Sequence, residues 1–206
     1  MMSTEQQIAQ ALLQAGAVLL RPDQPFTFAS GIKSPVYCDN RILLGDVAAR
    51  RFVTQAFVTQ CTGADVLAGP ATGGIAWAAW AAEILGLPMA YVRSSAKGHG
   101  RSQQIEGCAV TGRTVTLLED TISTGESALN AAQALREAGA IVERCVCIFT
   151  WDWAATRNAF AEAQIPLVAL ATLSDLLTIA TAEGRLNEAQ HALIERWAAD
   201  PKAWQP

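Results

Sequence analysis

The sequence predicts an α/β fold in which a parallel sheet is flanked by helices. Short apolar segments alternate with helix-like segments over about 46–206, and this alternation is typical of parallel strands joined by helical crossovers. Turns rich in small residues follow two of the apolar segments, at 70–74 and 121–127. Hydrophobic residues make up 51% of the 206 residues and charged residues 17%, which supplies material for a core and argues against disorder.

The N-terminal residues lie outside that alternation. Ser3 opens a capping box ahead of an apolar helical period, which predicts a helix that ends near Gly16. Residues 21–45 mix Pro, Gly, Ser and aromatic residues without a helical period, so we expect short strands and turns there. Asp46 can cap the next helix, which should run to about Gln60.

The rest of the chain reads as a continuous α/β core. Residues 94–107 are polar and Gly-bearing with neither a strand nor a helix period, and they predict a long exposed loop. No linker or internal repeat is visible, so 1–206 is expected to form one domain, with about 1–45 as an N-terminal layer on the core. Strands are expected at 65–69, 88–93, 114–118, 141–150 and 166–173, and helices up to Gly86 and over 125–138, 153–163 and 187–199.

Composition and charge exclude several classes of protein. The net charge is -4, with 15 Lys and Arg against 19 Asp and Glu, so nucleic acid is not an expected partner. The five cysteines include no CxxC pair, which argues against a disulfide framework or a zinc site. The N-terminus lacks the basic region of a signal peptide, and no apolar run approaches the length of a membrane span. We therefore expect a soluble, cytoplasmic protein that does not bind membranes.

The segment after the strand at 114–118 predicts a site for a sugar phosphate. The turn at 121–127 would expose N–H groups at the positive end of the following helix, which suits a phosphate. Glu119 and Asp120 would repel a bare phosphate but can accept hydrogen bonds from sugar hydroxyls and stabilise a cation at the ribose carbon. The sequence contains neither a Gly-Lys-Ser/Thr loop nor a GxGxxG turn after a strand, so two common nucleotide motifs are excluded. An ordinary βα turn with solvated acids is the plainer alternative.

The whole run LLEDTISTGES (117–127) is more specific than that alternative. It resembles the phosphoribosyl pyrophosphate motif of the type I phosphoribosyltransferases. This resemblance implies the fold of that family, with a small hood over the sheet. It also implies that Glu119 and Asp120 bind the ribose and support catalysis. The residues expected to hold the 5′-phosphate are Thr121, Ile122, Ser123, Thr124, Gly125, Glu126 and Ser127.

A second turn, AGPATGGI (68–75), would place backbone donors at the same edge of the sheet. Local pattern alone fits a plain Gly-rich turn nearly as well. The segment resembles the pyrophosphate-binding loop of the orotate branch of this family, which implies that Thr72 and Gly73 contact substrate.

Cationic residues gather in the polar stretch that follows the strand at 88–93. Arg93, Lys97 and His99 are followed by Gly100 and IEG, a pattern that resembles the mobile catalytic loop of orotate phosphoribosyltransferases. In that family the loop reaches into the neighbouring subunit, which implies a homodimer with shared active sites. The three side chains are expected to bind pyrophosphate, and Lys97 or His99 to protonate or screen it as it leaves. Many members carry Lys where this chain has Ser94.

The segment FTFASGIKSPVY (26–37) resembles the N-terminal signature of the same family, which forms part of the hood over the orotate ring. Lys33 is the nearby cation expected to contact substrate. Some members have Lys where this chain has Ala29, and some have an Arg after the strand at 141–150 that this chain lacks. The residue that meets the orotate carboxylate is therefore left open among the hood backbone, Ser123 and Lys33.

Together these four segments imply transfer of a phosphoribosyl group from phosphoribosyl pyrophosphate to orotate, giving orotidine 5′-monophosphate and pyrophosphate in pyrimidine biosynthesis. Magnesium is the implied cofactor, since pyrophosphate leaves poorly until its charge is neutralised; no metal ligands are expected from the protein. Two alternatives are a phosphoribosyltransferase for another base and a regulatory protein that senses phosphoribosyl pyrophosphate without catalysis. The hood segment and the acidic net charge argue against them.

Overall fold

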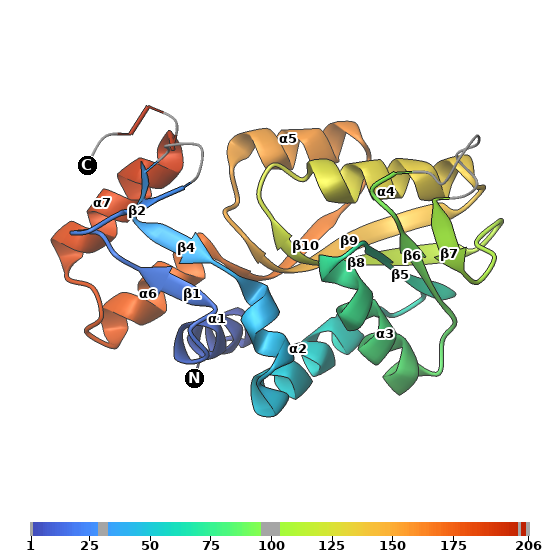
Figure 1. Cartoon of the computed structure of the whole chain (residues 1–206), viewed down its shortest axis with the longest axis horizontal. Coiled ribbons are helices and arrows are strands. Elements are labelled where there is room, and N and C mark those ends of the chain that lie inside the picture. The colour runs from blue at the N-terminus through green and yellow to red at the C-terminus, as the bar shows by residue number, and fades with distance from the viewer. Residues whose placement is uncertain (1, 29–32, 96–103, 202, 205–206) are drawn as a thin grey trace. The chain divides into compact units, whose positions relative to one another are not determined.

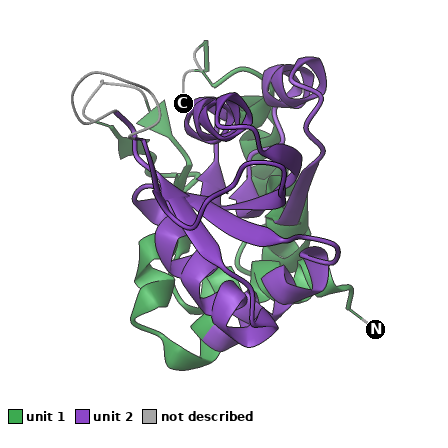
Figure 2. Ribbon diagram, turned by 90° about the vertical axis from the view of Figure 1, so that its right-hand side faces the viewer, with its two compact units in different colours: residues 1–50, 171–206 green, residues 51–170 purple. Residues whose placement is uncertain are grey.

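The computed structural model describes residues 2–28, 33–95, 104–201 and 203–204. The chain divides into two units. One is formed by residues 1–50 and 171–206, and the other by residues 51–170 (Figure 2).

The unit at 51–170 is built on the predicted sheet. Its strand order is β10-β9-β8-β5-β6-β7, and the pairs β5·β6, β5·β8 and β8·β9 are parallel. Helices α4 and α5 cover one face of the sheet, and α3 packs on the other (Figure 1). The strands are β5 (Val66–Pro70), β6 (Met89–Val92), β7 (Ile105–Gly107), β8 (Thr114–Ile122), β9 (Ile141–Thr150) and β10 (Leu167–Thr172), and the helices are α3 (Gly73–Leu85), α4 (Glu126–Glu137) and α5 (Ala154–Glu162).

Two details of this sheet differ from the sequence prediction. β8 does not end at Leu118 but continues to Ile122, because the ten-residue strand β9 offers it pairing partners as far as Thr150. The predicted loop at 94–107 ends in a short strand, since Ile105–Gly107 pairs antiparallel with β6. The sheet is therefore mostly parallel, with an antiparallel pair at this edge, and the two acids lie within a strand.

Several local predictions are confirmed. Asp46 caps α2 (Val47–Gln60), with its Oδ1 atom accepting hydrogen bonds from two backbone N–H groups at 2.9 and 3.0 Å. Gly86 ends α3 in the left-handed conformation that favours glycine. Cys145 and Cys147 are fully buried in β9 and pack as small apolar side chains.

The other unit contains both ends of the chain. α1 (Thr4–Gln14) has the predicted capping box and packs against α6 (Leu173–Ala182), which in turn contacts α7 (Glu188–Ala199). Sequence analysis did not predict α6, although Thr172 and Asp175 form a capping box at its start. The remaining elements are β1 (Val18–Leu20), β2 (Phe26–Thr27), β3 (Lys33–Ser34), β4 (Val36–Cys38) and the 3-10 helix η1 (Asn40–Leu44), with β1 antiparallel to β4 and β2 antiparallel to β3.

No helix in the described ranges has the length and apolar character needed to cross a membrane.

Candidate active site

The two acids occupy the last part of β8, where alternate side chains point to opposite faces of the sheet. Glu119 lies opposite Cys147 of β9 and lines a cavity on the α4 side. Asp120 faces the other way, towards the start of α3, because its carboxylate lies beside Gly73. The strand therefore divides the pair between the two faces at the carboxyl edge of the sheet.

Glu119 is buried, with only 5% of its surface exposed. Burial, and secondly the negative charge of Asp120, raise the pKa of Glu119 to about 8. The Oε1 atom of Glu119 accepts a hydrogen bond from the backbone N–H of Asp120 at 3.0 Å, which opposes that rise. The raised pKa favours the neutral form of Glu119, so the pair carries less negative charge than two fully ionised carboxylates would. This lowers the repulsion that a phosphate group would meet at this edge.

The turn at 70–73 and the start of α3 pack directly against the end of β8, at Asp120 and Leu118. A Cβ atom added to Gly73 would lie 2.7 Å from the carboxyl carbon of Asp120, and one added to Gly74 would lie 2.3 Å from the carbonyl oxygen of Leu118. Only glycine allows so close an approach. The two glycines of the predicted pyrophosphate turn therefore bring its backbone into contact with the end of β8.

The residues around the start of α4 form a cavity of about 250 Å³, which we call the cradle cavity. Gly125 is the N-cap of α4 and supplies no side-chain cap, so the first N–H groups of the helix remain available to an anion. The cavity is lined by Glu119, Thr121, Ile122, Ser123, Thr124, Gly125, Glu126, Ser127 and Ala128.

Two buried threonines hold the cradle in place from neighbouring elements. The Oγ1 atom of Thr150 donates to the carbonyl oxygen of Ile122 at 3.0 Å, and Oγ1 of Thr156 donates to that of Ser123 at 2.6 Å. Gly125 has φ of 83° and its Cα packs against the ring of Phe160, where a Cβ would come within 2.5 Å. Sequence reasoning missed these contacts, because the residues stand 28 to 35 positions further along the chain and belong to no local pattern.

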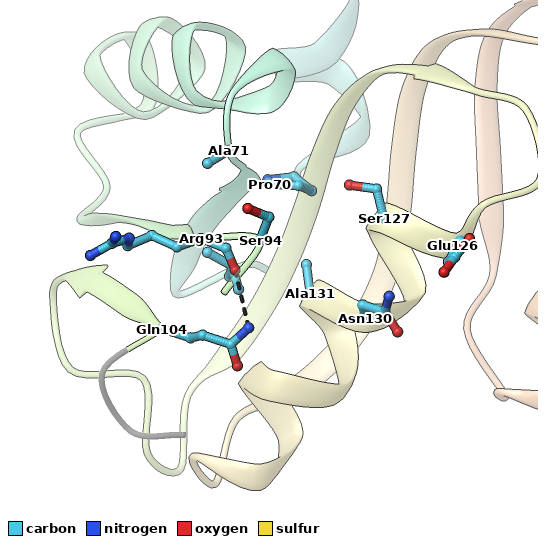
Figure 3. Close-up of a pocket in the computed structure, with 10 residues that line it drawn as sticks. Pro70, Ala71, Arg93, Ser94, Gln104, Glu126, Ser127, Asn130 and Ala131 are labelled. Carbon is cyan, nitrogen blue, oxygen red and sulfur yellow. Dashed lines mark hydrogen bonds between the residues drawn. The ribbon is translucent and has the colours of Figure 1, made fainter. Parts of the chain in front are cut away.

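A second cavity of about 260 Å³ lies between α4 and the β6–β7 hairpin. In Figure 3 the Gln104 side chain reaches towards α4 and bonds to Arg93, whereas the Arg93 guanidinium extends away from α4. Glu126 and Ser127 line this cavity as well as the cradle cavity. Its lining residues are Pro70, Ala71, Val92, Arg93, Ser94, Gln104, Glu126, Ser127, Asn130 and Ala131.

Arg93 is the predicted cation that the structure places at the sheet edge. The carbonyl oxygen of Val92, the residue before it, accepts a hydrogen bond from the N–H of Ala71 at 2.7 Å, so Arg93 adjoins the turn at 70–73. Lys97 and His99 lie outside the described residues. Lys33 lies on β3 in the unit formed by both chain ends, and its side chain is exposed. Within the described ranges, no cluster of three or more His, Cys, Asp or Glu residues could hold a metal ion.

Comparison with known proteins identifies the family. A family model for the phosphoribosyl transferase domain matches residues 47–159. Orotate phosphoribosyltransferase of Listeria monocytogenes serotype 4b is 44% identical over 207 aligned residues, which cover 98% of this chain and 99% of the relative. The chain belongs to the orotate phosphoribosyltransferase family. The resemblance of its four sequence segments to that family is thereby confirmed.

Other members of the orotate phosphoribosyltransferase family also match this chain over most of its length, and one solved structure has the same fold. The protein of Cutibacterium acnes is 44% identical over 202 residues, covering 96% of this chain and 94% of its own. The crystal structure of orotate phosphoribosyltransferase from Aeropyrum pernix is 32% identical, with a TM-score of 0.74 over 87% of this chain and 99% of that chain. The likeness therefore covers the full length of typical relatives and is not limited to the phosphate-binding core.

Proposed function

We infer that this protein is an orotate phosphoribosyltransferase, which forms orotidine 5′-monophosphate and pyrophosphate from orotate and phosphoribosyl pyrophosphate. The observation that carries this conclusion is near full-length similarity to orotate phosphoribosyltransferases. The contact between Gly73 of the turn at 70–73 and Asp120 of β8 supports it, because the two turns could then bind the two ends of one donor molecule.

In the proposed mechanism, the bond from the ribose C1′ to pyrophosphate breaks as the bond from C1′ to N1 of orotate forms, and N1 gives up its proton to water. The cradle cavity holds the 5′-phosphate through the free N–H groups at the start of α4 and the hydroxyls of 121–127. Glu119 and Asp120 bind the ribose hydroxyls, and the negative charge of the pair stabilises the positive ring of the transition state. Thr72 and Gly73 offer backbone donors to pyrophosphate.

Arg93, Lys97 and His99 are proposed to contact pyrophosphate as negative charge builds on it. Arg93 adjoins the turn at 70–73, which supports its part in this set. Lys97 or His99 would supply the proton or the positive charge that makes pyrophosphate a better leaving group. Lys33 is proposed to contact substrate from the hood. We also propose that the two units of the chain work together as one domain.

Magnesium is the proposed cofactor, and it would neutralise charge on pyrophosphate. The described residues offer no cluster of acids able to form a cage around the ion. Magnesium usually keeps several waters and binds through one or two carboxylates together with substrate phosphates, and the ion is proposed here to be carried mainly by pyrophosphate oxygens and water. We further propose that the protein is a cytoplasmic homodimer with shared active sites.

The activity can be tested by following the absorbance of orotate with phosphoribosyl pyrophosphate and magnesium. We expect orotate to be consumed only when all three components and the protein are present, and we expect chelation of magnesium to stop the reaction. Uracil, adenine and hypoxanthine in place of orotate test the alternative bases. Magnesium-dependent use of one of these bases, with orotate left unchanged, would refute the proposed acceptor.

A further inference from the structure

Glu106 contacts the side chain of Tyr91 in the neighbouring strand β6 and that of Arg93, the residue that follows this strand. Its Oε2 atom accepts a hydrogen bond from the hydroxyl of Tyr91 at 2.6 Å, and its Oε1 atom accepts one from Nη1 of Arg93 at 3.2 Å. Tyr91 and Glu106 are direct partners in the antiparallel pair of β6 and β7. The Glu106 carboxylate thus links the guanidinium of Arg93 to the paired strands β6 and β7.

The main chain of Arg93 is fixed as well. Its N–H donates to the carbonyl oxygen of Gln104 at 2.9 Å, and its own carbonyl oxygen accepts from Nε2 of Gln104 at 3.2 Å. The preceding residue, Val92, is tied to Ala71 of the turn at 70–73. With the backbone held at the turn, the remaining freedom of Arg93 lies in its long side chain, which is the part that Glu106 restrains.

This restraint contributes little to folding. The side chains of Arg93 and Glu106 are 28% and 41% exposed, and ion pairs with that much contact to water stabilise proteins only weakly. Its larger effect is on binding, because an arginine that is already ordered loses less side-chain freedom when it meets a ligand. Glu106 takes one of the five N–H donors of the guanidinium, which leaves four for phosphate oxygens.

We propose that Glu106, oriented by Tyr91, is a positioning residue that holds the Arg93 guanidinium ready for pyrophosphate. This inference rests on the proposed function, and it adds two residues to the pyrophosphate end of that site. Glu106 raises the pKa of the Tyr91 hydroxyl mainly through their hydrogen bond, so Tyr91 keeps its proton and remains a donor across the physiological range. The arrangement orders the cation without covering all of its donors.

The reverse reaction tests the proposal, because pyrophosphate is then a substrate with its own KM. Glu106→Gln should raise the KM for pyrophosphate about tenfold, while the KM for orotidine 5′-monophosphate and kcat change by less than about twofold. Tyr91→Phe should shift the KM for pyrophosphate in the same direction by a smaller factor. A general disturbance of the site would raise the KM for both substrates. A rise in the KM for pyrophosphate alone therefore indicates that Glu106 positions Arg93.

Glu183→Gln is the matched control. Glu183 also bridges an amide and an arginine, since it accepts from Gln10 and Arg185 at 2.7 Å each, but it belongs to the other unit. This variant should leave both KM values unchanged. Combining Glu106→Gln with Arg93→Ala should give no further rise in the KM for pyrophosphate beyond that of Arg93→Ala alone, because the proposed effect of Glu106 on pyrophosphate runs through the Arg93 side chain.

The proposal fails if Glu106→Gln leaves the KM for pyrophosphate unchanged in an active enzyme, or if its effect persists in the Arg93→Ala background. If Glu106→Gln proves unfolded by circular dichroism, Tyr91→Phe decides the question through the same two KM values. Calorimetric titration of the protein with pyrophosphate in the presence of magnesium distinguishes failure of the positioning role from failure of the proposed function. Wild-type binding that weakens in Glu106→Gln supports positioning even if orotate is not the acceptor, and equal binding by both proteins overturns it.

Discussion

The protonation of Glu119 changes the charge expected at the candidate active site. Two adjacent acids at a phosphate site look repulsive when both are counted as charged. Burial raises the pKa of Glu119 to about 8, which favours the neutral form of its carboxyl group near neutral pH. A protonated carboxyl group can donate one hydrogen bond and still accept others, which suits the hydroxyls of a ribose. The remaining charge on Asp120 faces the turn at 70–73.

The raised pKa of Glu119 predicts how stability depends on pH. Between about pH 4.5 and 8 the unfolded chain loses this proton while the folded chain keeps it, so Glu119 lowers the stability of the fold progressively as pH rises. Glu119→Gln removes this term and keeps the shape of the neutral acid. The melting temperature of the variant, relative to wild type, should therefore rise by several degrees from pH 5 to pH 8.5.

Thermal unfolding at the two pH values measures this difference. Glu126→Gln is the control for replacing a carboxylate by an amide in the same region, because Glu126 is exposed at the start of α4. A constant offset between Glu119→Gln and wild type across the range would show that Glu119 is ionised in the folded protein at neutral pH.

At the level of elements, pairing partners and caps decide where strands and helices begin and end. β8 extends through both acids because β9 continues beside it to Thr150. α6 begins at Leu173 because the Oγ1 atom of Thr172 accepts from the N–H of Asp175, while the Asp175 carboxylate accepts from the N–H of Thr172. The Thr172–Asp175 pair is visible in the sequence, but Thr172 lies within the expected strand at 166–173, so the local pattern does not separate the end of the strand from the start of the helix.

The cap of α6 can be tested by substitution. Thr172→Ala removes the side-chain acceptor and should lower the free energy of unfolding by about 1 kcal/mol. Thr178→Ala in the same helix is the matched control, since Thr178 is exposed and its hydroxyl bonds within the helix; the change should stay within about 0.5 kcal/mol. Urea denaturation gives both values. Equal effects of the two substitutions would contradict a capping role for Thr172.

At the level of the whole molecule, the predicted catalytic loop raises the question of whether two chains share each active site. The proposal of shared active sites requires that Lys97 of one chain act with Glu119 and Asp120 of another. A Lys97→Ala protein and a Glu119→Gln, Asp120→Asn protein would each be nearly inactive. In a mixed population, half of the dimers would be hybrids, and each hybrid would contain one site with all three residues intact.

Mixing the two inactive proteins should therefore restore about a quarter of the wild-type activity if subunits exchange fully. Exchange can be verified separately with a fluorescent label on each protein. Mixing Lys97→Ala with itself under the same conditions is the control and should restore nothing. Absence of recovery, with exchange demonstrated, would place Lys97 in the same chain as the acids it serves.

The sequence by itself determined the fold class, the family and the identity of most candidate residues. These follow from local order: an apolar strand, two acids and a run of small residues are adjacent in the chain and need no tertiary information. Tertiary structure decided which groups meet. It set Gly73 against Asp120, buried Glu119 deeply enough to raise its pKa, and joined Glu106 to Arg93. These effects depend on distance and burial in space, which local sequence patterns do not encode.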